Sequence, residues 1–245
     1  MKKILLYSGG MDSWLINKLW NPDICLYVNM HTKYSENEIS KLPKNVQVID
    51  FPLGQWERDD AIIPLRNLYL IMVACNMTED EDVKICLGAT AGDRVLDKSE
   101  EFVTKANIQL NYLYQPQHWI PKGKKVEICI DYKGYTKKKL IQQFVAEGGN
   151  LEEAFSQSFS CYNPVDGKEC WQCKPCFRKF IAFALNGKTF DSNTSRQVIR
   201  YIKTYIKPQI DRGNYGRKEE ESDIKEVLDK WDIWDIMMNR KDIIQ

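Results

Sequence analysis

The six residues Ser8 to Ser13 constrain the fold of this chain more than any other segment. They read SGGMDS, follow the short apolar run Lys3 to Tyr7, and precede a stretch whose apolar residues recur at i, i+4 spacing. This order predicts a strand, a glycine loop and a helix. Such a junction suits an anion, because glycine lets backbone N–H groups approach it and the helix N-terminus adds positive charge.

The chemistry of this loop predicts a nucleotide site for ATP and Mg²⁺. Serine hydroxyls can donate to phosphate oxygens, and the carboxylate of Asp12 is the hard ligand that Mg²⁺ prefers. The loop lacks the lysine of a GxxxxGKS loop, so it favours a leaving pyrophosphate over γ-phosphoryl transfer. The alternative is a tight turn with a serine cap. The residues predicted to bind the nucleotide are Ser8, Gly9, Gly10, Met11, Asp12 and Ser13.

Further apolar runs predict the fold class of the N-terminal part. Strands are expected at Ile24 to Asn29, Val46 to Phe51 and Val83 to Leu87, with a buried helix at Leu65 to Cys75. Strands that are apolar on both faces and alternate with helices indicate a parallel sheet that is covered on both sides. The predicted fold is therefore α/β, with a doubly wound and mainly parallel sheet.

The second half of the sequence predicts helices and a cysteine-rich excursion. A helix is expected at Thr136 to Glu147, and the segment 160–183 runs into another. After Gly187 the composition becomes polar, and helices are expected at Ser195 to Ile206 and Asp223 to Met238. The last helix has one apolar stripe, made of Ile224, Val227, Leu228, Trp231 and Trp234. We predict a domain over 1–187 and a helical extension over 188–245, which either completes its own core or forms a dimer or partner surface.

Charge and hydropathy indicate the class of partner and the compartment. Lys plus Arg number 35 against 34 for Asp plus Glu, so the net charge of +1 favours no polyanionic partner, and nucleic acid is not expected. No window approaches the roughly 20 apolar residues of a membrane span, and the first apolar run is too short for a signal-peptide core. We expect a cytoplasmic protein without a membrane partner. Four of the eight cysteines are scattered singly through apolar segments, as in a reducing compartment; they are Cys25, Cys75, Cys86 and Cys129.

The other four cysteines predict a structural zinc site. Cys161, Cys170, Cys173 and Cys176 form the pattern C-x8-C-x2-C-x2-C, in which each C-x2-C hook can place two thiolates on one ion. Four thiolates close the coordination sphere, so the expected role is structural. An iron–sulfur cluster suits the same ligands and stays an alternative. Unrelated buried thiols are disfavoured, because polar and turn-forming residues lie between the cysteines.

These motifs together resemble one enzyme family. SGGMDS is similar to the signature loop of the PP-loop ATP pyrophosphatase superfamily, and within it the chain most resembles 7-cyano-7-deazaguanine synthases. Four further elements carry this resemblance: PLRN at Pro64 to Asn67, GATAGDRVLDKSEEF at Gly88 to Phe102, TK at Thr136 and Lys137, and SCYNPVDGKECWQCKPCFRKFIAF from Ser160. The resemblance covers about Lys3 to Phe183.

The resemblance implies a fold and a reaction. The fold is the adenine nucleotide alpha hydrolase-like sheet. The reaction is an ATP-dependent carbon–nitrogen ligation, in which 7-carboxy-7-deazaguanine and ammonia become 7-cyano-7-deazaguanine through adenylated and amide intermediates, with release of AMP and pyrophosphate. Such an enzyme serves queuosine and 7-deazaguanine biosynthesis or DNA modification. We also expect a homodimer.

Site residues follow from matching these motifs. The catalytic residues expected are Asp12, Arg66 and Lys137, and the substrate contacts expected are Arg66, Asn67, Asp93 and Asp97. Arg66 has a fork of donors for a carboxylate, and Lys137 opens a helix, where a phosphate would offset its charge. The alternatives are an Arg66 whose head reaches water, a Lys137 that is one of several surface lysines, and acidic residues that form a solvated helix start.

The chain departs from the family at two places. Arg94 to Asp97 replaces a tyrosine-proline-aspartate-cysteine run, and the stretch His31 to Glu38 replaces an aspartate-tyrosine-glycine-glutamine stretch. The sequence therefore supports the use of ATP more directly than it supports a particular substrate. The rival functions are a divergent member that makes the amide or attaches a deazaguanine to a macromolecule, an RNA-thiolating enzyme, and a non-catalytic nucleotide-binding module.

Overall fold

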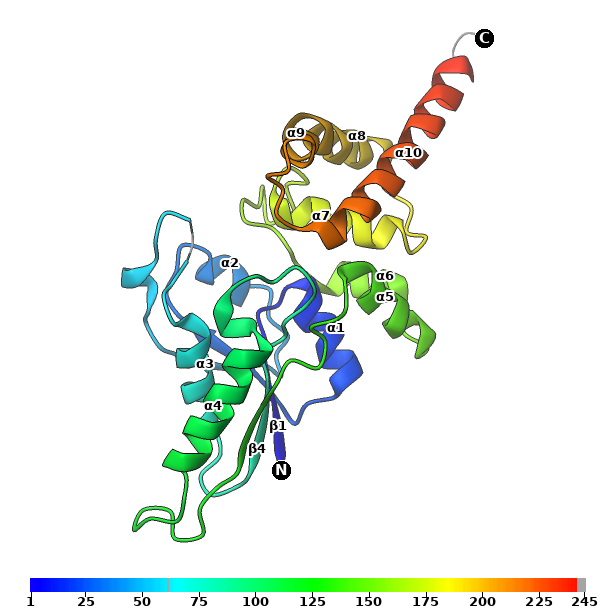
Figure 1. Ribbon diagram of the computed structural model, residues 1–245. Helices are drawn as coiled ribbons and strands as arrows, with labels where there is room; N and C mark the ends of the chain where they lie inside the picture. The colour runs from blue at the N-terminus through cyan, green and yellow to red at the C-terminus, as the bar shows by residue number, and fades with distance from the viewer. Residues whose placement is uncertain (61, 242–245) are drawn as a thin grey trace. The chain divides into compact units, whose positions relative to one another are not determined.

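The chain folds into two compact units. The computed structural model describes residues 1–60 and 62–241, with side chains described up to residue 232. The first unit comprises Met1–Tyr135 and Gln157–Phe159, and the second comprises Thr136–Ser156 and the chain from Ser160 onward. Each unit has its own core (Figure 1).

The first unit is built on a five-stranded parallel sheet. Its strands are β1 (Lys2–Leu6), β2 (Ile24–Asn29), β3 (Gln47–Asp50), β4 (Val83–Cys86) and β5 (Val126–Cys129). They lie in the order β3-β2-β1-β4-β5, and every neighbouring pair is parallel. The strand order reverses beside β1, which pairs with both β2 and β4. The glycine loop after β1 therefore lies at a topological switch point, where α/β sheets bind ligands.

Helices cover both faces of this sheet, which confirms the predicted doubly wound fold. Helix α1 (Met11–Trp20) lies against one face, and α3 (Arg66–Cys75) and α4 (Glu100–Leu113) lie against the other (Figure 1). On the α3 and α4 face, Ile71 and Leu110 pack with Ile4 and Ile85 of the central strands. A short helix α2 (Ser35–Ile39) and two 3₁₀ turns, η1 (Gly54–Trp56) and η2 (Leu96–Lys98), lie in the connections.

The edge strand β3 differs from the predicted pattern. All four of its residues are exposed, including Val48 and Ile49. The expectation of strands that are apolar on both faces therefore fails for β3, because an edge strand has a neighbour on one side only. Strand β5 and helices α2 and α4 were not predicted from the sequence.

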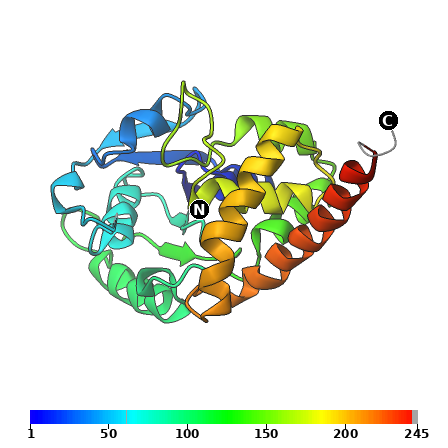
Figure 2. The ribbon, with the colours of Figure 1, turned by 90° about the horizontal axis from the view of Figure 1, so that it is seen from above.

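The second unit is helical. It contains α5 (Lys137–Ala146), most of α6 (Leu151–Gln157), α7 (Lys174–Ala184), α8 (Ser192–Tyr201), the π turn η3 (Ile202–Ile206), α9 (Lys207–Asp211) and α10 (Lys218–Lys241). Figure 2 shows α7 to α10 in colours from yellow-green to red. Phe177 and Ile181 of α7 share one core with Ile199 of α8 and with Ile224 and Val227 of α10.

The tail therefore completes a core of its own unit. Leu228 and Trp231 pack on this core, so this part of the predicted apolar stripe is confirmed, whereas the side chain of Trp234 lies outside the described residues. This core joins α7 to helices beyond residue 187. The compact units of the structure therefore differ from the predicted domains 1–187 and 188–245. A functional division at 187 stays a prediction. Among the described residues, no helix combines the length and apolarity needed to cross a membrane.

Candidate active site

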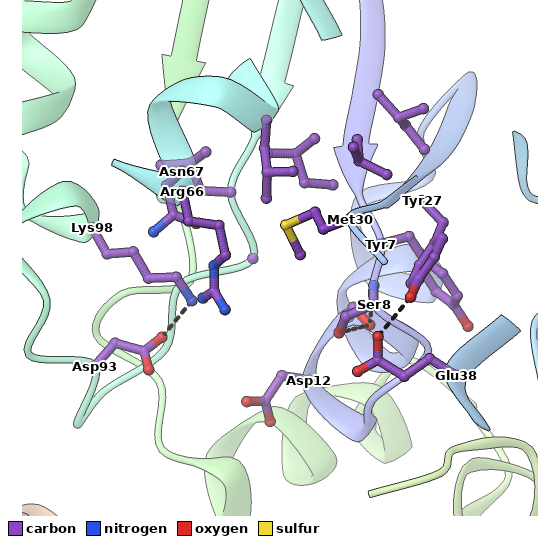
Figure 3. A pocket seen from close by; sticks show the side chains of 17 residues that line it. Tyr7, Ser8, Asp12, Tyr27, Met30, Glu38, Arg66, Asn67, Asp93 and Lys98 are labelled. Atoms are coloured by element: carbon purple, nitrogen blue, oxygen red, sulfur yellow. Dashed lines mark hydrogen bonds and ion pairs between the residues drawn. The ribbon is translucent and has the colours of Figure 1, made fainter. Parts of the chain in front are cut away.

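A cavity of about 230 Å³ opens at the carboxyl ends of β1, β2 and β4 in the first unit (Figure 3). Apolar side chains line it together with hydroxyl, carboxylate, guanidinium and ammonium groups. The residues that line it are Leu6, Tyr7, Ser8, Asp12, Ser13, Leu26, Tyr27, Val28, Met30, Glu38, Arg66, Asn67, Leu70, Leu87, Gly88, Asp93 and Lys98. A concave, partly apolar site with a few convergent polar groups is the usual form of a small-molecule site.

The glycine loop is held in shape by its two serines. The Ser8 N–H donates to Ser13 Oγ at 3.3 Å, and Ser13 Oγ donates to the Gly10 carbonyl at 3.0 Å. Gly9 adopts a φ of +73°, which favours glycine, and a Cβ there would lie 3.3 Å from the Leu42 side chain. Gly10, which has no side chain, is the N-cap of α1. The serines thus bond within the loop, and the alternative of a serine-capped turn does not describe this helix start.

Asp12 is connected to the loop after β4. Thr90 Oγ1 donates to Asp12 Oδ2 at 3.4 Å, and the Thr90 N–H donates to Asp93 Oδ2 at 3.2 Å. Asp93 also forms an ion pair with Lys98 at 3.1 Å, in which both side chains are largely buried. Thr90 therefore contacts two carboxylates that both line the cavity. The Asp12 carboxylate faces the cavity and is an oxygen donor of the type that binds Mg²⁺ (Figure 3).

Arg66 and Asn67 enter the cavity from the first turn of α3. Leu65, the N-cap, has a φ of +60° and provides no side-chain cap. Instead, Asp97 Oδ2 accepts a hydrogen bond from the Asn67 N–H at 3.3 Å. Asp97 thereby fixes the N-terminal end of α3, and it does not line the cavity itself. Its predicted substrate contact stays a prediction, as do the roles of Arg66 and Asn67, although both of these line the cavity.

Tyr27 and Glu38 line the cavity but were not predicted from the sequence as site residues. The Tyr27 hydroxyl donates to Glu38 Oε2 at 2.7 Å. Burial raises the pKa of the Glu38 carboxyl, while the Tyr27 hydrogen bond and the Arg66 guanidinium lower it. Tyr27 belongs to an apolar strand and Glu38 to a polar stretch without a motif, so only the sheet topology brings them together.

Lys98 and Tyr7 were also missed. Lys98 follows a segment that departs from the family pattern, and its ammonium group lies beside Arg66 in Figure 3. The Tyr7 hydroxyl is buried and has no hydrogen-bond partner in the described part of the chain. Burial raises the pKa of this phenol. Its position at the end of β1 was the one signal in the sequence that could have indicated a cavity residue.

Lys137 belongs to the second unit. It is the first residue of α5, and Thr136 caps this helix by accepting a hydrogen bond from the Lys139 N–H at 3.3 Å. Thr136 therefore explains why the helix begins here. The predicted contact between Lys137 and phosphate stays a prediction.

The four clustered cysteines lie together in the second unit. Their Sγ atoms all lie within 4.8 Å of one another. Four Zn–S bonds of about 2.3 Å in a tetrahedron would place the sulfurs about 3.8 Å apart, so this cluster fits a zinc ion after small adjustments. The Cys170 N–H donates to Cys161 Sγ at 3.3 Å, and the Gln172 N–H donates to Cys170 Sγ at 3.4 Å. These donors stabilise thiolates, as metal sites require.

A buried ion pair supports this cluster. Lys179 of α7 is 2% exposed and contacts Glu169 at 2.9 Å. Glu169 also accepts a hydrogen bond from the Ser160 N–H at 2.7 Å, next to the first cysteine. The pair thus joins the start and the middle of the cysteine segment to α7. Among the described residues, all eight cysteines are free thiols.

Comparison with known proteins decides the family. The family model of the queuosine biosynthesis protein QueC matches residues 40–187, which include Arg66, Asp93, Lys98 and the four clustered cysteines. The chain belongs to the QueC family. The predicted resemblance is thereby confirmed, and with it the link to queuosine biosynthesis that the family description states.

Curated relatives agree with the QueC assignment. The chain is 26% identical over 223 residues to the 7-cyano-7-deazaguanine synthase of Pseudoalteromonas translucida, which covers 77% of this chain and 96% of that relative. It is 25% identical over 220 residues to the 7-cyano-7-deazaguanine synthase of Marinobacter nauticus, with 76% and 94% covered. The enzyme of Marinomonas is 26% identical over 222 residues, with 77% and 95% covered. The similarity therefore extends over nearly the full length of these QueC relatives.

Proposed function

We propose that this protein is an ATP-dependent ligase that converts 7-carboxy-7-deazaguanine and ammonia to 7-cyano-7-deazaguanine. One observation carries the proposal: the glycine loop, the Asp12 carboxylate and the cations Arg66 and Lys98 all border a single cavity at the switch point of the sheet. Membership of the QueC family supports the deazaguanine acid as substrate. The released products are AMP and pyrophosphate.

In this proposal the glycine loop holds the phosphates that leave. The N–H groups of Gly9, Gly10 and Met11 and the hydroxyls of Ser8 and Ser13 surround pyrophosphate at the start of α1, where the helix dipole favours negative charge. Asp12 would hold Mg²⁺, which neutralises phosphate charge when bound.

The first chemical step forms an acyl adenylate. A carboxylate oxygen of the substrate attacks the α-phosphorus of ATP, the bond from that phosphorus to the bridging oxygen breaks, and pyrophosphate leaves. Arg66 and Lys98 hold the carboxylate in line and offset its charge, so the chain contributes mainly positioning and electrostatic stabilisation. Ammonia then attacks the acyl carbon and loses a proton, and AMP leaves, which gives the amide.

The second chemical step removes the amide oxygen. That oxygen attacks a second ATP in the same way, with release of a second pyrophosphate. Loss of AMP from carbon and of the remaining protons from nitrogen then gives the nitrile. A family member that stops after the first step would release the amide, which differs from the nitrile by one water.

The test is turnover by the purified zinc-loaded protein. Incubation with ATP, Mg²⁺, ammonium and 7-carboxy-7-deazaguanine should form AMP and pyrophosphate, and mass spectrometry should identify the nitrile. Glu36→Gln serves as a control, because Glu36 is an exposed residue of α2 away from the cavity. Absence of acid-dependent AMP formation would overturn the proposal, and an amide as final product would correct it to an amide synthase.

A further inference from the structure

We infer that Glu38, held in place by Tyr27, is a specificity-determining residue that accepts hydrogen bonds from the N1–H and the 2-amino group of a guanine-type base. No motif in the sequence indicated this residue. The inference rests on the proposed function and deepens it, because it names the group by which the cavity selects its base.

The cavity has two chemically different sides. Figure 3 shows the Glu38 carboxylate on the side of Tyr27, while Arg66 and Lys98 lie on the other side. A 7-carboxy-7-deazaguanine molecule is divided in the same way. Its carboxylate is on the five-membered ring, and the N1–H and 2-amino donors lie on the far edge of the six-membered ring. With the carboxylate at the two cations, the donor edge is directed toward Glu38.

Glu38 is prepared to accept these hydrogen bonds. Its Oε2 accepts the Tyr27 hydroxyl at 2.7 Å, and Tyr27 is itself buried in β2. Oε1 accepts no hydrogen bond from the residues that the structure describes. An ionised carboxylate has about four lone-pair positions, so acceptor capacity remains for two adjacent N–H donors. Tyr27 fixes the orientation of the group, which reduces the entropy lost when a base binds.

The same group disfavours an adenine-type base. At the two corresponding positions adenine carries a ring nitrogen that is an acceptor and a C–H group. A carboxylate therefore meets the lone pair of the ring nitrogen with a lone pair of its own, and it finds no amino donor beside it. A site built to accept from a donor discriminates strongly against an analogue that lacks it. Glu38 thus separates guanine-type from adenine-type rings in a cavity that also handles ATP.

A magnesium ligand is the competing role for a carboxylate in this cavity. Asp12 already provides a carboxylate within the phosphate loop, whereas Glu38 comes from α2 and is bonded to a tyrosine of β2. The two roles predict different rescue experiments. A lost magnesium ligand is compensated by a higher Mg²⁺ concentration, and a lost base contact is not.

The experiment compares base binding by the wild type and Glu38→Gln, without turnover. Calorimetry measures the affinities for 7-deazaguanine and 7-deazaadenine, with a nonhydrolysable ATP analogue at saturation. The wild type should prefer 7-deazaguanine. Glu38→Gln keeps an acceptor for Tyr27 but presents an amide N–H₂ to a donor, so its affinity for 7-deazaguanine should fall about 10- to 100-fold, while 7-deazaadenine binding changes little.

Two variants control this experiment. Glu36→Gln removes an exposed carboxylate from the same helix and should retain the base preference of the wild type. Tyr27→Phe removes the positioning hydroxyl and should reduce the preference by less than Glu38→Gln does. Circular dichroism and thermal unfolding of each variant would establish that it is folded.

The outcomes separate this inference from the proposed function. A wild type without base preference, a Glu38→Gln variant with unchanged preference, or a defect that excess Mg²⁺ restores would each overturn the role of Glu38. If the preference disappears in Glu38→Gln and no Mg²⁺ concentration restores it, the role is supported. Pyrophosphate release is measured independently, so a protein with the preference but without acid-dependent AMP formation would contradict the proposed function alone.

Discussion

The cavity of the first unit and the cysteine cluster of the second are built in opposite ways. The cavity joins residues from five separate segments, from Leu6 to Lys98, and a parallel sheet holds these segments in place. The cluster takes all its ligands from one short stretch, Cys161 to Cys176, with few apolar residues between them. The sheet can therefore form the cavity before any ligand binds, whereas we expect the cluster to need a metal to hold its turns together.

The largest effect should follow a change in the cavity that leaves the fold intact. Asp12→Ala removes the carboxylate that would hold Mg²⁺, and we expect pyrophosphate release to fall at least about 100- to 1000-fold. The melting temperature and the zinc content should match those of the wild type. Full activity in this variant would refute the assignment of Asp12 as the magnesium ligand, and with it the view that the cavity residues serve catalysis while the cysteine cluster serves folding.

Loss of a cysteine should have the converse effect. Cys176→Ser removes one of four ligands, so we expect zinc to be lost and the segment 160–183 to become sensitive to protease, with destabilisation of several kcal/mol. Metal analysis and limited proteolysis measure these changes, and chelation of the wild type should reproduce them. An iron signal in place of zinc would correct the identity of the metal. Equal protease resistance with and without metal would show that the turns are stable on their own.

A smaller effect is expected at the ion pair beside the cluster. Lys179→Met leaves the Glu169 carboxylate buried without its partner, which should reduce the free energy of unfolding by about 3 to 5 kcal/mol. The double variant Lys179→Met with Glu169→Gln should recover part of this loss, because no buried charge remains. Urea denaturation measures both. If the double variant is as unstable as the single one, the packing of Lys179 and not its charge is what matters.

The smallest effect concerns the pH dependence of Glu38. Because burial raises the pKa of this carboxyl above 4.5, its favourable contribution is complete below the unfolded pKa and is lost as the pH rises through the folded pKa. The wild type should therefore lose stability relative to Glu38→Gln as the pH rises from acid to neutral. Denaturation at several pH values tests the sign. A relative gain in stability over this range would mean that Tyr27 and Arg66 outweigh burial.

Local motifs were predictable from the sequence, and long-range groupings were not. The loop SGGMDS, the start of α3 and the four cysteines each have a pattern within a few residues. Tyr27, Glu38 and Lys98 have none, because their proximity arises only when β2, α2 and the loop after β4 meet at the sheet edge.

The missed elements have equally physical causes. Strand β5 contains only the four residues VEIC after a lysine-rich segment, too few to show a period. Helix α4 leaves Ile108 and Tyr112 exposed, which obscures its amphipathic pattern. Strand β3 was predicted as buried from its apolar residues, but a sequence does not reveal which strand lies at the edge.

The hydrogen bond from the Asn67 N–H to Asp97 has a consequence for local fluctuations. It ties the first turn of α3 to a short 3₁₀ turn that lies 30 residues further along the chain. Opening of that turn would remove the acceptor and expose the amide, so Asn67 should exchange its hydrogen for deuterium at the rate of the 3₁₀ turn and faster than the middle of α3. Arg66, which adjoins this amide, would then be displaced whenever the turn opens. Lys98 is the last residue of the same turn and would move with it, so the cavity would lose both of these cations together.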